Sequence, residues 1–200
     1  MVDRKVKLIL ASASGIRQRL LRDAGLSFDV VPAGIDERAV AAKLAALPVP
    51  ERAKGLAEAK AIFVSNSQPG AIIIGADQML ELDGEVLSKA RDADAARRVL
   101  QRLRGRTHHL HSGVAVAKDG KAVWSLVQSA TLSVRAFSET WLDAYVADAG
   151  DALTKSVGAY QLEGPGVQLF ERIDGDYFTI LGLPLLPLFA GLRRLGVSED

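Results

Sequence analysis

The 200-residue chain contains no cysteine, and this absence narrows the chemistry open to it. Without cysteine there are no disulfides, no thiolate zinc sites and no thiol nucleophile. Cysteine-free composition fits a cytosolic protein, because disulfides belong to oxidising compartments. An excess of one charge is also missing, since 25 Lys and Arg stand against 24 Asp and Glu, for a net charge of +1. That balance gives no electrostatic footprint for nucleic acid or for an anionic membrane, so we expect neither as a partner.

The chain also lacks an apolar stretch long enough to cross a bilayer. A spanning helix needs about 20 predominantly apolar residues. The most apolar segment, 177–192, is shorter and is interrupted by Pro184 and Pro187. The N-terminal apolar run is too short for the core of a signal peptide. These patterns predict a soluble, cytoplasmic protein.

Several familiar functional motifs are missing as well. The sequence has no G-x-x-x-x-G-K-[ST] loop, no G-x-G-x-x-G after a strand and no G-x-S-x-G elbow. Three histidines, His108, His109 and His111, invite a metal interpretation, and the last two share one face of a predicted strand. No carboxylate lies near them in sequence, so structural or exposed histidines are the favoured interpretation.

What is present predicts one α/β domain. With 48% hydrophobic residues the chain can bury one sizeable core, so we expect a single domain over residues 1–200, with room for two lobes and an active-site cleft between them. Asp83-Gly84 and Asp119-Gly120 are strong hairpin signals, so the central sheet is expected to be mixed, bent and flanked by helices. Strands are predicted at 6–10, 28–31, 71–74, 79–82, 85–87, 108–117, 121–134, 157–161 and 167–173. Helices are predicted at 16–24, 51–64, 93–103, 139–149 and 183–195.

Two places bring polar side chains to the ends of buried strands. Asp77 follows the strand 71–74, and a carboxylate there must reach water, a metal or a cation, because burying it unpaired costs several kcal/mol. Ser12 and Ser14 lie between the first strand and the first helix, where hydroxyls and free N–H groups can bind an anion, with Arg17 one turn further on. Taken alone, each place is as well explained by surface charges and an ordinary helix cap.

Together with other blocks, however, these stretches resemble the Maf nucleotide pyrophosphatases. The resemblance runs in order from the first strand to the last helix. Its blocks are LASAS (10–14) with Arg17, Asp36-Glu37, LAEAKA (56–61), GAD (75–77), Lys89, GRTH (105–108), SGV (112–114), GAY (158–160), EG (163–164), IDG (173–175) and GLPL (182–185).

The resemblance implies a reaction and a set of active-site positions. It implies a cytoplasmic enzyme, expected as a homodimer, with a mixed α/β fold related to the inosine triphosphate pyrophosphatases. Such an enzyme hydrolyses a nucleoside triphosphate to the monophosphate and pyrophosphate with Mg²⁺ or Mn²⁺. Asp77 matches the family's catalytic acid, described as the proton acceptor. The other matching active-site positions are Ser12, Arg17, Glu37, Lys60 and Lys89.

These residue types suit the implied chemistry. Attack of water at the α-phosphorus needs a base or a metal-binding carboxylate, roles for which Asp77 and Glu37 are suited. Asp77 as base and Asp77 as metal ligand both remain open. The departing pyrophosphate carries several negative charges, which Lys60, Lys89 and Arg17 would stabilise.

Departures from the common family pattern indicate which nucleobase the substrate carries. Gln78 stands where many members have Thr, and Glu163 stands where the thymidine and uridine triphosphate enzymes have Gln. Both features, and the run at 169–172, resemble the subgroup that acts on 7-methyl-GTP. Methylation at N7 makes guanine cationic. A carboxylate distinguishes such a cation from a neutral pyrimidine better than an amide does. Ile16, where that subgroup often has an aromatic residue, offers only an apolar face.

Three other interpretations stay open. The chain is also compatible with a dTTP or UTP pyrophosphatase, with an enzyme that removes inosine or other damaged triphosphates, and with a nucleotide-binding regulator of cell division. The regulator would bind nucleotide at the same residues and turn it over slowly.

Overall fold

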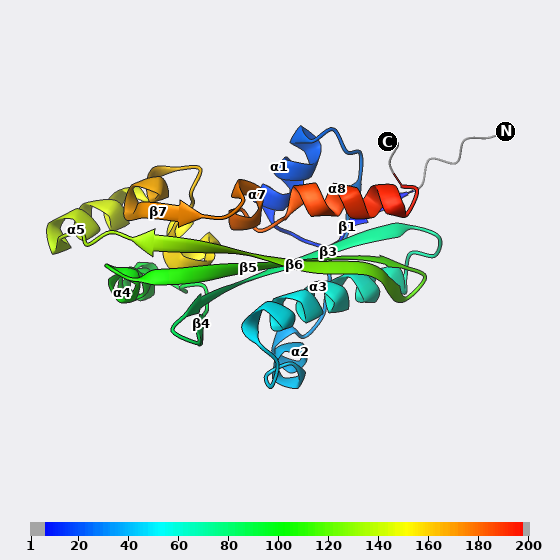
Figure 1. Cartoon of the computed structure of the whole chain (residues 1–200), viewed down its shortest axis with the longest axis horizontal. Helices are drawn as coiled ribbons and strands as arrows, with labels where there is room; N and C mark the ends of the chain where they lie inside the picture. Colours follow the sequence, from blue (N-terminus) through cyan, green and yellow to red (C-terminus); the bar gives the residue numbers. More distant parts are fainter. Residues whose placement is uncertain (1–6, 198–200) are drawn as a thin grey trace. The chain divides into compact units, whose positions relative to one another are not determined.

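One hydrogen-bonded sheet organises the chain (Figure 1). In the computed structural model, which describes residues 7–197, it has seven strands in the order β2-β1-β3-β5-β6-β7, with β4 paired to β3 off this path. Strand β1 is parallel to both β2 and β3, whereas the β3–β4 and β6–β7 pairs are antiparallel. The prediction of a mixed sheet is confirmed.

The elements follow the predicted order closely. The strands are β1 Leu8–Leu10, β2 Asp29–Val30, β3 Ile72–Leu82, β4 Glu85–Leu87, β5 Thr107–Lys118, β6 Lys121–Val134 and β7 Phe170–Asp174. The α-helices are α1 Gly15–Asp23, α2 Glu37–Lys43, α3 Val49–Ser65, α4 Ala93–Leu103, α5 Glu139–Asp148, α6 Ala152–Lys155, α7 Tyr177–Ile180 and α8 Leu185–Arg194. Two 3₁₀ helices, η1 Val157–Ala159 and η2 Pro165–Leu169, precede β7. Val6, the first residue of the first predicted strand, lies outside the described residues.

The chain divides into two compact units that share three strands. Of the described residues, unit 1 comprises 7–77, 112–128 and 182–197, and unit 2 comprises 78–111 and 129–181. Strands β3, β5 and β6 therefore each belong partly to one unit and partly to the other. The expected active-site cleft between two lobes stays a prediction.

In unit 1, helix α3 lies against one face of the strands, and α1 and α8 lie on the opposite side (Figure 1). The close approach of α3 to the sheet depends on two glycines of the neighbouring strands β3 and β5. A Cβ on Gly75 would stand 2.2 Å from the Ala57 carbonyl oxygen, and one on Gly113 would stand 2.4 Å from the Ala53 carbonyl oxygen. Because glycine has no side chain, the backbone of α3 can rest directly on β3 and β5. Small buried side chains, including Ala57, Ala61, Ala115 and Ala117, fill the rest of this contact.

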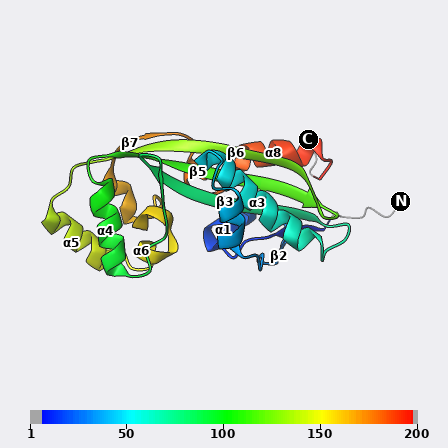
Figure 2. The same cartoon turned by 90° about the horizontal axis from the view of Figure 1, so that it is seen from below.

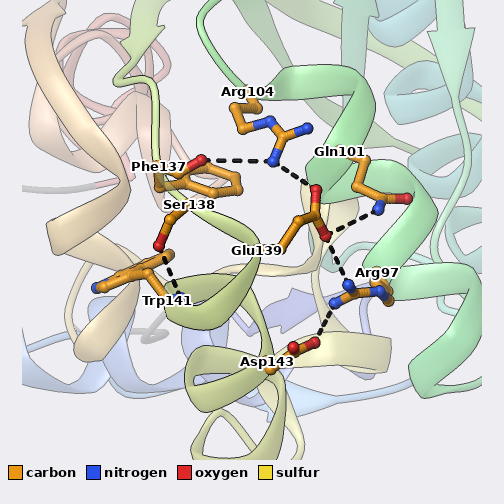
Figure 3. A network of polar contacts seen from close by, with 8 residues as sticks. All are labelled: Arg97, Gln101, Arg104, Phe137, Ser138, Glu139, Trp141 and Asp143. Atoms are coloured by element: carbon orange, nitrogen blue, oxygen red, sulfur yellow. Dashed lines mark hydrogen bonds and ion pairs between the residues drawn. The ribbon is translucent and has the colours of Figure 1, made fainter.

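In unit 2, the helices and the strands enclose an apolar core. Helices α4, α5 and α6 gather together (Figure 2) and pack around buried residues such as Leu100, Leu132 and Leu142. Charged side chains join α4 to α5 at the surface (Figure 3). Arg97 contacts Glu139 and Asp143, and Arg104, just after the end of α4, contacts Glu139 as well. These two arginines are therefore occupied in holding the two helices together.

The hairpin predictions are confirmed, and two strand predictions are wrong. Asp83 and Gly84 have φ of 50° and 83°, the positive pair that a type I′ turn requires, and the turn at 119–120 has the same form. The strands predicted at 71–74 and 79–82 are one continuous strand, β3, so Asp77 lies within a strand and does not follow its end. The predicted strand at 157–161 is instead the 3₁₀ helix η1, because Gly158 and Ala159 have φ of 81° and 59°. Left-handed backbone cannot continue a strand.

Two further boundaries differ from the sequence prediction. The first residues of the predicted strand 167–173 belong to η2, and the apolar segment 177–192 holds two separate helices, α7 and α8. No helix within residues 7–197 combines the length and the apolar character that a membrane span requires.

Candidate active site

Lys60 holds two carboxylates together in unit 1. Its Nζ lies 2.7 Å from Oδ1 of Asp77 and 3.0 Å from Oε1 of Glu37. Lys60 and Asp77 are both buried, with 8% and 9% of their surface exposed, whereas Glu37 reaches in from the exposed start of α2. A buried carboxylate next to a buried ammonium avoids the cost that either charge would have alone.

The backbone explains why this pair forms. Gly75 and Asp77 are two residues apart on β3, so both lie on the same face of the strand, the one that faces α3. Because Gly75 lets the backbone of α3 come close, the side chain of Lys60 is long enough to reach the carboxylate two residues further along. Asp36, whose side chain accepts hydrogen bonds from Arg38 and Ala39, begins α2 and thereby fixes the position of Glu37.

Arg17 ties three separate segments of unit 1 together. Its Nε donates to the Gly182 carbonyl oxygen at 2.9 Å, and one Nη donates to the Ala76 carbonyl oxygen at 2.9 Å and to Ser12 Oγ at 3.2 Å. Burial lowers the pKa of the guanidinium, and the nearby carboxylates of Asp77 and Glu37 act in the opposite direction. Arg17 therefore fixes the backbone immediately before Asp77. The sequence predicted Arg17 only as a phosphate ligand.

Ser14 and Ile16 lie at the start of α1, in the same loop. Ser14 occupies the N-cap position, but its side chain makes no capping hydrogen bond. Its backbone N–H donates to Ser12 Oγ at 3.3 Å instead. The first N–H groups of α1 thus receive no capping hydrogen bond from the Ser14 side chain, and anion binding there stays a prediction. Ile16, in the first turn of the helix, is half-buried.

The other predicted site residues belong to unit 2. The amide nitrogen of Gln78 donates to the carbonyl oxygens of Thr179 and Ile180, at 3.2 and 3.0 Å, so it holds the last turn of α7. Lys89 is exposed in the connection between β4 and α4. Glu163 is exposed in the turn between η1 and η2.

The three histidines have structural partners. His111 lies between Ser129 Oγ, 2.7 Å from its Nδ1, and Glu81 Oε2, 2.8 Å from its Nε2. His109 stacks on His111 at 6.0 Å between ring centroids, and His108 is fully buried with its Nε2 2.7 Å from the Tyr160 hydroxyl. Among the described residues, no three His, Cys, Asp or Glu side chains are grouped so that they could hold a metal.

The carboxylates of Glu37 and Asp77 in unit 1 have the chemistry of ligands for a divalent cation. Mg²⁺ is commonly held by one or two carboxylates together with substrate phosphates and water, so it needs no cage of protein ligands. Glu37 and Asp77 supply two carboxylates within reach of one ammonium group. Their oxygens are the hard ligands that Mg²⁺ and Mn²⁺ prefer.

The sequence did not single out a cationic pocket in unit 2. It has a volume of about 460 Å³ and includes Lys89. The residues that line it are Ser88, Lys89, Ala90, Arg91, Ala95, Arg98, Val99 and Arg102. The last four recur at helical spacing on α4, and this stripe was the signal in the sequence that could have shown which arginines share a face.

Comparison with known proteins matches nearly the whole chain to one family and to relatives about 50% identical to it. The family model for Maf-like proteins matches residues 7–195. A 7-methyl-GTP pyrophosphatase of Brucella abortus is 53% identical over 192 residues, which cover 94% of this chain and 96% of that protein. A nucleoside triphosphate pyrophosphatase of Maricaulis maris is 51% identical over 194 residues, which cover 97% and 99%. A solved dITP/XTP pyrophosphatase of Mycobacterium abscessus is 15% identical over 94% of each chain, with a TM-score of 0.42, too low to support an argument.

Proposed function

The chain belongs to the family of Maf-like proteins, and from this premise we propose that it hydrolyses a nucleoside triphosphate to the monophosphate and pyrophosphate. The observation that carries the proposal is the high identity, over nearly the whole chain, to relatives named for this activity. The arrangement of Glu37, Lys60 and Asp77 supports it, because it supplies a base and a cation at one place.

In the proposed reaction, a water molecule attacks the α-phosphorus and the bond to the bridging oxygen of the β-phosphate breaks. Asp77 accepts the proton that the water loses. Lys60 donates to Oδ1 of Asp77, and in the described part of the chain no hydrogen bond reaches Oδ2, so Oδ2 is the oxygen that takes the proton. Pyrophosphate leaves with the electron pair of the broken bond.

The remaining residues bind and orient the triphosphate. The first N–H groups of α1, with the hydroxyls of Ser12 and Ser14, would hold phosphate oxygens. Arg17 uses Nε and one Nη on protein oxygens, which leaves its second Nη for a phosphate. Lys89 would take up charge that develops on the leaving pyrophosphate.

Glu37 is the residue that would hold Mg²⁺ or Mn²⁺ while Asp77 acts as the base, and Asp77 would join Glu37 on the cation only in the alternative in which Asp77 is a metal ligand instead of the base. When bound, the cation would polarise a phosphoryl oxygen and offset the charge of the triphosphate. Lys60 keeps both carboxylates in place in the meantime, because its ammonium group lies against one oxygen of each.

We further propose 7-methyl-GTP as the preferred substrate, with Glu163 as the residue that reads the base. The exposed carboxylate of Glu163 is suited to the positive charge of N7-methylated guanine. The contribution that we expect from Gln78 is indirect, because its amide nitrogen is already bound to the last turn of α7. Ile16 would offer an apolar surface to the base.

The test is pyrophosphate release from 7-methyl-GTP, GTP, dTTP, UTP, CTP and ITP with Mg²⁺ or Mn²⁺. The same panel is run on Glu163→Gln. We expect 7-methyl-GTP to give the highest kcat/KM and the variant to lose that preference while it retains hydrolysis of other nucleotides. Preference for dTTP or UTP would contradict the assignment of the base but not of the reaction. Turnover of none of the six would contradict the reaction itself.

A further inference from the structure

The pocket beside Lys89 is lined by four cationic side chains and no acidic one. Lys89 and Arg91 come from the connection before α4, and Arg98 and Arg102 come from α4 itself. Apart from Ser88, the rest of the lining is apolar and consists of Ala90, Ala95 and Val99. A concave surface with one sign of charge on a low-dielectric floor concentrates counter-ions of the opposite sign.

Nearby acids offset only part of this positive charge. Arg91 pairs with Asp92, Arg102 pairs with Glu85, and Lys89 has an interaction of its own. Neither Asp92 nor Glu85 lines the pocket. Within residues 7–197, Arg98 makes no hydrogen bond or ion pair, although Asp92 lies near enough to act on its charge. Its guanidinium therefore keeps its donors for a ligand, and an anion in the pocket would relieve repulsion among the four cations.

Neither the helix terminus nor a structural ion pair explains the position of Arg98. The N-terminus of α4 is already capped, because the Asp92 side chain accepts from the Ala95 N–H at 2.7 Å. The arginines that hold α4 to α5 are Arg97 and Arg104 (Figure 3), and neither of them lines the pocket. Arg98 thus belongs to a different face of the helix from the one that α5 covers.

We propose that this pocket binds the pyrophosphate group and that Arg98 is a further phosphate-binding residue beside Lys89. The identity of the anion rests on the proposed function, in which pyrophosphate is released. The presence of an anion site rests only on the residues that line the pocket. Pyrophosphate carries several negative charges, which complement the four cations, and it is small enough to enter the pocket. Guanidinium groups bind its oxygens in pairs.

The proposal is tested by calorimetric titration of the full chain with inorganic pyrophosphate, without nucleotide. Arg98→Gln removes one cation from the pocket, and Arg194→Gln makes the same change of net charge on an exposed residue of α8 outside it. We expect Arg98→Gln to weaken pyrophosphate binding roughly tenfold, the loss of one charge-assisted contact. Arg194→Gln should bind like the unmodified chain. The inhibition constant of pyrophosphate in the hydrolysis assay should rise by the same factor for Arg98→Gln.

The outcomes separate this inference from the proposed function. If the unmodified chain does not bind pyrophosphate, or if Arg98→Gln and Arg194→Gln bind it equally, the pocket is not the pyrophosphate site, whatever the hydrolysis assay gives. Binding of inorganic phosphate as tight as that of pyrophosphate would also overturn the proposal, since a site for two linked phosphates gains from both. If Arg98→Gln weakens binding but no nucleotide is hydrolysed, the anion site stands and the reaction falls.

Discussion

Lys60 holds the carboxylates of Asp77 and Glu37 in position. Its ammonium group touches both Asp77 and Glu37, and only 8% of the surface of the residue is exposed. A change at Lys60 would leave Asp77 buried without its cation, which combines a loss of stability with a loss of function. A change at Asp77 can be made far more conservatively, because an asparagine oxygen still accepts the hydrogen bond from Nζ.

We therefore expect Asp77→Asn to lower kcat by about 10²–10⁴-fold, the usual contribution of a general base, while the fold persists. The amide keeps the shape and the hydrogen bond of the carboxylate but cannot take a proton from water. Pyrophosphate release gives the rate, and the thermal melting temperature shows whether the variant is folded. Full activity in a folded Asp77→Asn protein would exclude Asp77 as the base.

His108 makes the stability of the protein depend on pH. Burial, with a smaller effect from His109, lowers the pKa of His108 to about 4 from an ordinary value of 6.5. Between pH 6.5 and 4, His108 is protonated in the unfolded chain but neutral in the folded chain. The free energy of unfolding therefore falls as the pH falls from 6.5 toward 4. This group alone should lower the free energy of unfolding by about 1.5 kcal/mol between pH 6.5 and pH 5.

The comparison is with His108→Gln, which does not titrate and keeps a polar atom near the Tyr160 hydroxyl. Urea unfolding at several pH values gives the free energy for both proteins. We expect the variant to lose stability less steeply with acid over pH 6.5 to 5. Equal slopes for the two proteins would mean that His108 has the same pKa in the folded and the unfolded chain, and would contradict the prediction.

At the scale of elements, the contact between α3 and β3 sets the geometry of the site. A methyl group at position 75 would meet the Ala57 carbonyl oxygen at 2.2 Å and the Ala61 backbone nitrogen at 2.7 Å. Both are backbone atoms, so the helix as a whole would have to move. Lys60 lies on that helix and Asp77 lies on that strand, so the same movement would lengthen their contact.

We expect Gly75→Ala to lower the free energy of unfolding by about 3 kcal/mol, at the upper end of overpacking costs, and to reduce kcat as well. The matched control is Gly34→Ala, whose methyl group would meet only the Phe63 ring at an ordinary 3.8 Å. Chemical unfolding and pyrophosphate release measure the two effects. A Gly75→Ala protein as stable and as active as Gly34→Ala would show that α3 need not rest on the backbone of β3.

The sequence predicts those elements whose signal is local. The Asp-Gly turns at 83–84 and 119–120 were found because two residues with positive φ have a distinctive composition, and the helices were found from their apolar spacing. The segment 157–161 was mistaken for a strand because β-branched and aromatic residues there indicate an extended chain. Gly158 turns left-handed instead, in a packing with Tyr160 and Leu80 that only the folded chain brings about.

The candidate site shows the same limit. The family resemblance pointed to Lys60 and Asp77, and the structure joins them at 2.7 Å, but no sequence pattern predicted that Lys60 also reaches Glu37. Nor did a pattern predict that Arg17 would hold two backbone carbonyl oxygens, because those partners are 59 and 165 residues away. Long-range contacts to the main chain leave no trace in residue type.

For the molecule as a whole, the shared strands predict one cooperative unfolding transition. Strands β3, β5 and β6 each contribute to both units, so neither unit can lose its strands while the other keeps its own intact. The chain has two tryptophans, Trp124 on β6 in unit 1 and Trp141 on α5 in unit 2. Each tryptophan therefore reports on one unit.

We expect Trp124→Phe and Trp141→Phe, each with one remaining fluorophore, to unfold in urea with fluorescence and circular dichroism midpoints that coincide within each protein. The matched pair matters because each variant shifts its own stability, and only the agreement between probes within one variant is diagnostic. Separate fluorescence and circular dichroism transitions in either variant would show that one unit melts before the other.

The division of the chain also constrains how such a protein can diversify. Unit 2 is made of residues 78–111 and 129–181, and three of the four points at which the chain passes between units fall inside strands. A recombination event that exchanges one contiguous stretch of gene cannot transplant a whole unit, and breakpoints at the unit borders would cut β3, β5 or β6. We therefore expect new base preferences among relatives to arise from point substitutions at positions such as 163, rather than from the exchange of modules.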